Sequence, residues 1–187
     1  MSTLLTPVRS ARDTRVALVG ITGFAIALAA ASQVAIPLPL TPVPITLQPL
    51  VVALAGLMLG PTAGAASMVL YLAAGAAGLP VFAPIGAPGI ARFFGPTGGY
   101  LIAYPAAAFV AGVLARREPS LVGRWLAATA GVVVILFGGV AQLAIVSQSV
   151  GRAIAIGLTP FALLDIVKAF VAALIAGRRL PSIRQAD

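Results

Sequence analysis

The sequence predicts an all-α integral membrane protein, a compact bundle of six transmembrane helices with both termini in the cytoplasm. Three observations support this class. Of 187 residues, 60% are apolar and 9% are charged, whereas soluble domains are nearer half apolar and a quarter charged. The chain divides into six apolar stretches, and a span needs about 20 such residues. Most of its twelve basic residues fall where a six-span topology places them on one side.

The apolar stretches follow one another with short connections. We expect spans at residues 16–36, 46–59, 61–77, 97–115, 125–146 and 160–176. The second and third are short, and Gly60-Pro61 between them predicts a turn. The spans form one six-helix transmembrane domain, residues 16–177, between a cytoplasmic N-terminal segment (1–15) and a cytoplasmic C-terminal tail (178–187).

The basic residues predict the orientation. A six-span bundle brings three clusters to one side: Arg9, Arg12 and Arg15; Arg116, Arg117 and Arg124; Arg178, Arg179 and Arg184. The positive-inside rule makes that side cytoplasmic. A net charge of +8 would indicate nucleic acid in a soluble protein. Here the basic residues lie next to the predicted spans, and the membrane topology accounts for the positive charge. We therefore expect membrane lipid, and no nucleic acid, as a partner.

The composition excludes several kinds of chemistry. The chain has no cysteine, no histidine and four acidic residues, which removes thiolate chemistry, imidazole metal sites and histidine acid–base catalysis. An enzyme with two intramembrane carboxylates has almost no residues to use. No glycine run is followed by the lysine of a nucleotide-binding loop. We therefore expect no enzyme activity, no ATPase in this chain, no metal and no cofactor.

Two outer loops have compositions that suit a lid. The loop at residues 37–44 is rich in proline, and the loop at residues 78–95 is rich in glycine and proline. Proline leaves a loop less backbone freedom to lose, so both can fold over a cavity at modest cost. Aromatic residues in and after the second loop can wall an apolar pocket: Phe82, Phe93, Phe94 and Tyr100.

Asp165 and Lys168 are the leading candidates for a binding site. Thr159 is a plausible N-cap and Pro160 suits the first helical position, which places the two groups roughly 8 and 12 Å into the last span. Their spacing puts them on one helix face. The pair is either a structural ion pair that fixes the helix or part of a site. We favour a site, because intramembrane ionisable groups usually mark function.

Arg92 and Gln48 each allow two interpretations. Arg92 is either an interfacial anchor that reaches head groups or a clamp for a carboxylate, which arginine can hold with two parallel bonds. Gln48 either forms a cap or an interhelical bond, or it contributes its amide to a ligand. In the first span, Ala25 and Ala29 are spaced by four, as are Ala27 and Ala31, and small residues at that spacing allow close helix contact.

Several motifs together resemble the BioY family, the biotin-specific S components of energy-coupling factor (ECF) transporters. They are PVPITLQPL at residues 42–50, GLPVFA at 78–83, GPTGGYL at 95–101 and PFALLDIVKA at 160–169. The resemblance covers nearly the whole chain after the first fifteen residues. It implies six membrane helices with cytoplasmic termini, in the plasma membrane of a prokaryote.

The resemblance also implies a function, a site and partners. The function is high-affinity capture of biotin from the outer side, for delivery with an ATP-driven module. Asp165 would accept from the ureido ring, Lys168 would donate to a ligand oxygen, and Arg92 would take the carboxylate, although the division between Arg92 and Lys168 stays open. Gln48 would add a polar contact. The remaining implied residues are Tyr100 and Phe93 in the walls, and Ala25 and Ala29 against the ECF transmembrane coupling subunit, which carries paired ATPase subunits.

Three other functions compete with this interpretation. The first is a self-sufficient secondary carrier for biotin or another small vitamin, with Asp165 and Lys168 serving ion coupling. The second is an intramembrane enzyme, against which the residue inventory argues. The third is a structural scaffold without a ligand, which predicts that Asp165→Asn and Lys168→Met affect assembly alone.

Overall fold

The computed structural model describes residues 11–177, so most of the predicted cytoplasmic segment 1–15 and all of the predicted tail 178–187 lie outside the described residues. The described part is mostly helical, as predicted. Its elements in chain order are α1 (Ala11–Gln33), β1 (Ala35–Leu38), β2 (Thr41–Thr46), α2 (Gln48–Leu59), α3 (Pro61–Ala76), the 3-10 helix η1 (Gly89–Phe94), α4 (Gly98–Arg117), α5 (Leu121–Ser147), α6 (Val150–Gly157) and α7 (Ala162–Gly177).

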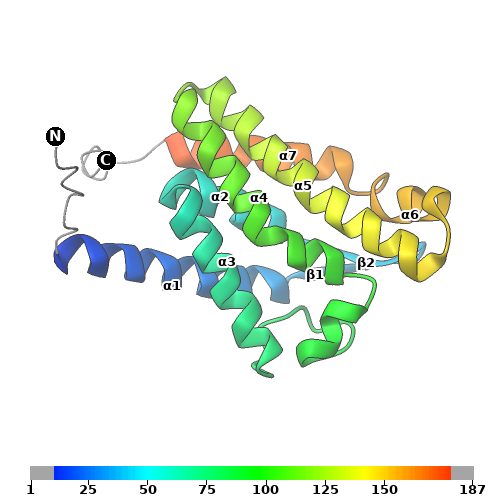
Figure 1. Ribbon diagram of the computed structural model, residues 1–187. Helices are drawn as coiled ribbons and strands as arrows, with labels where there is room; N and C mark the ends of the chain where they lie inside the picture. Colours follow the sequence, from blue (N-terminus) through cyan, green and yellow to red (C-terminus); the bar gives the residue numbers. More distant parts are fainter. Residues whose placement is uncertain (1–10, 178–187) are drawn as a thin grey trace, which may run out of the picture.

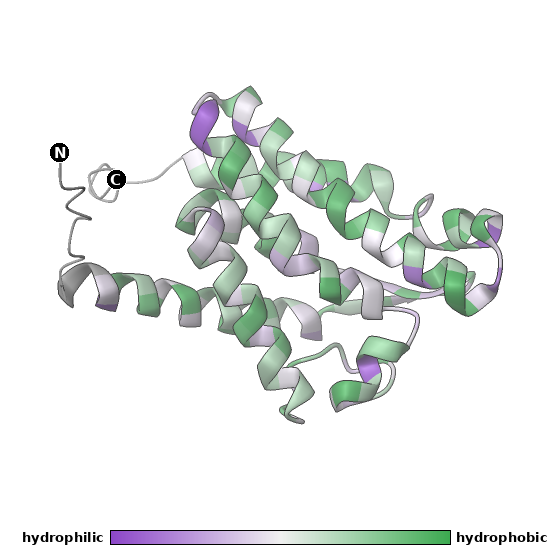
Figure 2. Cartoon of the chain, viewed as in Figure 1, coloured by the Kyte–Doolittle hydropathy of each residue, from purple (hydrophilic) through white to green (hydrophobic). Residues whose placement is uncertain are grey.

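The helices form a bundle with two distinct ends (Figure 1). The start of α1, the α2–α3 turn, the α4–α5 turn and the end of α7 lie at one end, on the left of the view. The β1–β2 hairpin, η1 and α6 lie at the other end, which we call the loop end. Figure 2 shows apolar residues along the helices, with hydrophilic residues concentrated near the two ends. This distribution is typical of a protein whose middle lies in lipid.

Helix length and composition show a multi-pass membrane protein. Three described helices are long and apolar enough to cross a membrane: Thr14–Gln33, Gly98–Arg117 and Leu121–Ser147. The pair α6 and α7 is bent by 49° and makes a fourth candidate if the two count as one broken span. Helices α2 and α3 are apolar but have only 12 and 16 residues. The predicted six passages therefore depend on these two shorter helices and remain a prediction.

The loop at residues 37–44 differs from the prediction, because it contributes to an antiparallel β-hairpin. Strand β1 pairs with β2 through Ala35 opposite Thr46 and Leu38 opposite Thr41. The register shifts between Ile36 and Leu38, where Pro37 lacks an N–H to donate. Proline is tolerated in edge strands and at such irregularities, and both strands of a two-stranded sheet are edges. The class is therefore helical with one small hairpin.

The last span also begins differently from the prediction. Helix α7 starts at Ala162, and the expected N-cap Thr159 instead donates its hydroxyl to the carbonyl of Ile154 at 3.2 Å. The prediction missed α6, a short helix whose cap is Ser149, with its hydroxyl oxygen accepting from the N–H of Arg152. As a result, Asp165 lies in the first turn of α7 and closer to the loop end than predicted.

Small residues bring the central helices close together. The carbonyl of Gly138 in α5 lies where a Cβ on Gly99 of α4 would sit, and a Cβ on Gly138 would meet Ala103 at 2.7 Å. Between α2 and α3, Gly60 adopts a φ of 80°, a conformation that favours glycine, as the predicted turn requires. This close packing holds the inner faces of α4 and α5 at fixed positions beside the cavity described next.

Candidate functional site

A cavity lies inside the bundle, next to the loop end. It is lined by residues of β2, the start of α2, the loop before η1, η1 itself, α4, α5 and α7, and its empty volume is about 610 Å³, counted to its open mouth. Concave spaces with mainly apolar walls and a few convergent polar groups typically bind small molecules. We call it the main cavity. Five of the six predicted substrate-binding residues line it: Asp165, Lys168, Arg92, Gln48 and Tyr100.

Asp165 and Lys168 form an ion pair in the wall of the main cavity. The Lys168 Nζ lies 2.7 Å from Asp165 Oδ1, and the two side chains are 14% and 5% exposed. The spacing of three along α7 places both on one face, as predicted. The second carboxylate oxygen of Asp165 has no protein partner among the described residues, so it can accept from a ligand. Lys168 keeps two further N–H donors.

Gln48 is held in place at the first residue of α2. Its Nε2 donates to the Tyr71 hydroxyl of α3 at 2.9 Å, and its Oε1 accepts from the Thr46 hydroxyl at 3.2 Å. Gln48 is 5% exposed and Tyr71 is 1% exposed. The predicted interhelical bond is therefore present, while the same amide also lines the main cavity. These fixed contacts orient the amide group at the polar part of the wall.

Arg92 is buried in the loop region although it carries a charge. Its two terminal nitrogens donate to the carbonyls of Ala83 and Ile85, and its guanidinium lies 6.0 Å from the centre of the Phe82 ring. Burial lowers the pKa of this guanidinium, but arginine remains charged at neutral pH because its pKa starts so high. No carboxylate pairs with Arg92 within residues 14–177, and its Nε is buried without a partner there.

The charges lining the main cavity do not balance. Asp165 contributes one negative charge, while Lys168 and Arg92 contribute two positive charges, so the wall carries a net charge of +1. The Asp165–Lys168 pair is internally compensated, which leaves the Arg92 charge in excess. A buried uncompensated cation favours an anionic ligand group, since charge-assisted bonds to a carboxylate or phosphate are strong.

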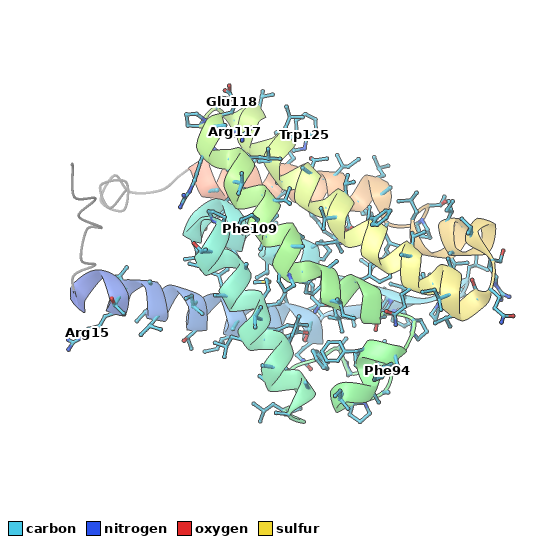
Figure 3. The ribbon with its side chains drawn as sticks, viewed as in Figure 1. Arg15, Phe94, Phe109, Arg117, Glu118 and Trp125 are labelled. Atoms are coloured by element: carbon cyan, nitrogen blue, oxygen red, sulfur yellow. The ribbon has the colours of Figure 1, made fainter. Side chains whose placement is uncertain are left out.

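Aromatic rings build the wall next to the loop. Phe82 packs edge-on against Tyr71 at 5.4 Å and against Phe93 at 5.7 Å between ring centres. Phe82 lines the main cavity, while Phe93 lies behind it and supports its position. A Cβ on Gly75 would collide with the Phe82 ring. Phe94, in contrast, is 77% exposed, and Figure 3 labels it on η1 at the loop end.

Tyr100 is positioned by two glycines on neighbouring helices. Its hydroxyl donates to the carbonyl of Gly157 in α6 at 2.7 Å, and its ring occupies the space that a Cβ on Gly139 of α5 would need. The side chain is thus fixed between α5 and α6, with one surface on the main cavity. The glycines in the sequence of α5 did not indicate that one of them makes room for the Tyr100 ring.

Two tyrosines in the site were missed by the sequence analysis. Tyr104 lines the main cavity at 3% exposure, one helical turn after Tyr100 on the same face of α4, and the four-residue spacing could have revealed it. Tyr71 fixes Gln48 and packs on Phe82. A tyrosine hydroxyl in an otherwise apolar, alanine-rich helix was the available signal, because a buried hydroxyl usually has a partner.

The segment over the main cavity is tied to two helices. Ser32, in α1, donates to the Val81 carbonyl at 2.6 Å, and its neighbour Gln33 donates to the Phe82 carbonyl at 3.2 Å. On the other side, the Gln142 amide of α5 donates to the carbonyls of Phe93 and Gly95 at 2.7 and 2.8 Å. Between these anchors, Arg92 holds the loop from within.

The predicted partner-interface residues face different surroundings. Ala25 is buried at 8% exposure and belongs to the hydrophobic core, and Ala29 is half-buried against that core. Ala27, in the other predicted pair, is exposed. Within residues 14–177, no three His, Cys, Asp or Glu side chains lie together as metal ligands would.

Comparisons with known proteins agree on one family. A model of the BioY family matches residues 2–185. The probable biotin transporter BioY of Pyrococcus horikoshii is 43% identical over 73% of this chain and 80% of that protein. The biotin transporter BioY of Thermotoga maritima is 41% identical over 76% and 84%. A crystal structure of the S-component for biotin from an ECF-type ABC transporter superposes with a TM-score of 0.84 at 27% identity, covering 91% of this chain and 94% of that one.

Proposed function

This chain belongs to the BioY family, and from that premise we propose that it captures biotin for uptake across the membrane. The chain is a non-enzymatic transporter subunit of the multi-pass membrane class, and its substrate is biotin. The observation that carries the proposal is the main cavity, which joins the Asp165–Lys168 pair, a buried arginine and an amide within apolar walls. The remaining paragraphs extend this function to individual residues, partners and topology.

The polar groups of the main cavity match those of biotin. The ureido ring of biotin has two N–H donors and one carbonyl acceptor. Asp165 accepts from this ring through its second carboxylate oxygen, and Lys168 donates to the ring carbonyl while it compensates Asp165. The sulfur ring and the aliphatic chain lie against the apolar wall of Phe82, Tyr100 and their neighbours. A matched buried site rejects analogues that leave its polar groups unpaired.

Arg92 binds the carboxylate at the other end of the ligand. The net charge of +1 in the wall supports this assignment, because the Asp165–Lys168 pair is already compensated. The Arg92 guanidinium at present donates to Ala83 and Ile85. A carboxylate would compete with these carbonyls, or would add to them at the unpartnered Nε. In the first case binding rearranges the contacts between Arg92 and the loop, and in the second it adds a bond to them; in both, the loop closes over the ligand.

Topology follows from the two ends of the bundle. Arg15 and Arg117 lie at the end where α1 begins (Figure 3), and we assign this end to the cytoplasm by the positive-inside rule. The loop end then faces outward, where biotin arrives. The apolar helices α2 and α3 each contribute a short passage, which gives six passages with cytoplasmic termini. The membrane is the plasma membrane of a prokaryote.

Transport requires partners of the ECF type. The proposed mechanism is capture without covalent chemistry, followed by reorientation that an ATPase in another subunit drives. We assign the coupling-subunit interface to α1, which includes the predicted residues Ala25 and Ala29. This chain supplies no ATPase of its own, and its lipid-facing surface is formed by exposed apolar side chains of other helices, among them Ile102, Val133 and Phe137.

Uptake of labelled biotin in a biotin-auxotrophic host tests the function. The host carries this chain alone, the chain with an ECF coupling module, or the module alone. The proposal expects uptake only when this chain and the coupling module are both present. It expects the Asp165→Asn substitution in this chain to abolish that uptake. Equal uptake by the chain alone would instead favour the self-sufficient secondary carrier.

A further inference from the structure

A second hollow adjoins the main cavity at the loop end. Its empty volume is about 620 Å³ when the open solvent at its mouth is included, and its wall includes Pro42 of the hairpin, Ile85 and Ala87 of the loop before η1, and Pro96 after η1. We call it the outer hollow. Arg92 and Thr97 line both spaces. Arg92 is therefore the charged group in the boundary between them, and its burial at 5% exposure fixes it there.

From this arrangement we propose that the outer hollow is a subsite for a neutral group attached to the carboxyl end of the substrate. The inference rests on the proposed function, in which that end lies at Arg92. A ligand that continues past Arg92 enters the outer hollow rather than a closed wall. The substrate class therefore includes amides of biotin with a short aliphatic substituent.

The chemistry of the outer hollow sets the kind of extension. Apart from Arg92, its lining carries no charged side chain, and prolines and small aliphatic residues predominate. An aliphatic substituent buries apolar area there, which favours binding in proportion to the area removed from water. A charged substituent would lose hydration without a partner. Arg92 can still donate to the amide carbonyl, although the bond is weaker than one to a carboxylate.

Calorimetry on the protein purified in detergent tests this subsite with three ligands: biotin, its primary amide and its N-butylamide. The primary amide controls for the loss of charge, which we expect to weaken binding about tenfold or more because the ion pair with Arg92 is replaced by a weaker bond to the amide carbonyl. The outer hollow predicts that the butylamide binds within about threefold of the primary amide, or more tightly. A butylamide at least a hundredfold weaker than the primary amide would overturn the subsite.

Two variants locate the extension. Ala87→Phe fills the outer hollow and should weaken the butylamide about tenfold or more, while biotin and the primary amide change less than threefold. Ala91→Phe is the matched control, because Ala91 is exposed on η1 and lines neither space. Equal effects of the two substitutions on the butylamide would contradict the subsite. Retained biotin binding in that case preserves the proposed function, whereas absence of biotin binding in folded wild-type protein overturns both.

Discussion

Lys168 donates to Asp165 across 2.7 Å from one turn further along α7, and both side chains face the same cavity. An ion pair inside a membrane bundle is expected to need its partners, because each charge is costly without the other. The pair leaves one carboxylate oxygen and two ammonium protons available to a ligand. The ion pair can therefore stabilise the position of α7 and still recognise a ureido group. The structural interpretation and the binding-site interpretation of the pair are thus compatible.

Asp165→Asn should weaken biotin binding by about tenfold to a hundredfold. The substitution removes the negative acceptor for the ureido N–H groups, and a bond to a charged group contributes roughly 1.5–3 kcal/mol. It also leaves Lys168 without its counter-charge. The double variant Asp165→Asn/Lys168→Met removes that second effect, so its melting temperature should recover while biotin binding stays low. Calorimetry and thermal unfolding in detergent measure the two quantities. If the double variant recovered biotin binding, direct ureido recognition by Asp165 would be wrong.

Arg92→Ala should reduce the preference for a carboxylate over a neutral end group. Wild-type protein is expected to bind biotin about tenfold or more better than its primary amide, because Arg92 forms an ion pair with the acid and only a weaker bond to the amide carbonyl. In the variant, the two ligands should bind within about threefold of each other. Competition binding with both ligands measures the ratio.

Arg92→Lys separates charge from loop support. It retains one positive charge but cannot reproduce the planar fork that reaches both Ala83 and Ile85. We expect it to keep part of the acid preference and to lose loop order, seen as faster proteolysis in the loop at residues 78–95. An unchanged acid-to-amide ratio in both Arg92 variants would assign the carboxylate to Lys168 instead.

Gly139→Ala should lower biotin affinity without touching the ligand. A methyl group at this position collides with the Tyr100 ring, and the ring is fixed by its bond to Gly157. Overpacking of this kind typically costs about 1–3 kcal/mol, and relief requires Tyr100 to move in the cavity wall. Gly151→Ala is the matched control, because no atom outside its own helix lies within 4 Å of a Cβ there. Equal biotin affinities of the two variants would show that the Tyr100 position does not matter.

Ala25→Leu and Ala29→Leu should differ in their effects. Ala25 is in the core, so a larger side chain should destabilise the protein itself by about 1–3 kcal/mol. Ala29 is half-buried at the edge of that core, and its substitution should disturb mainly the association with the coupling subunit. Thermal unfolding of the isolated chain and co-purification with an ECF module separate the outcomes. A stable Ala25→Leu protein that fails to co-purify would place Ala25 in the interface directly.

The sequence predicted the parts of the molecule that depend on local patterns. Apolar runs gave the main helices within a few residues, and the spacing of Asp165 and Lys168 placed them on one face. Features that depend on packing were missed. The β-hairpin contains several prolines that normally discourage strands, α6 is too short for a span pattern, and Thr159 bonds backward to Ile154. Tyr71 and Tyr104 reach the site through tertiary contacts, which neighbouring residues in the sequence do not reveal.

The most direct test is calorimetry of biotin binding to the isolated, purified protein after removal of endogenous ligand. The account predicts tight one-to-one binding in the absence of any coupling subunit, because the polar groups that match biotin all come from this chain. Desthiobiotin, which keeps the ureido ring, should bind far better than lipoate, which lacks it. If demonstrably folded protein failed to bind biotin, or bound desthiobiotin and lipoate equally, the assignment of the main cavity to biotin would be contradicted.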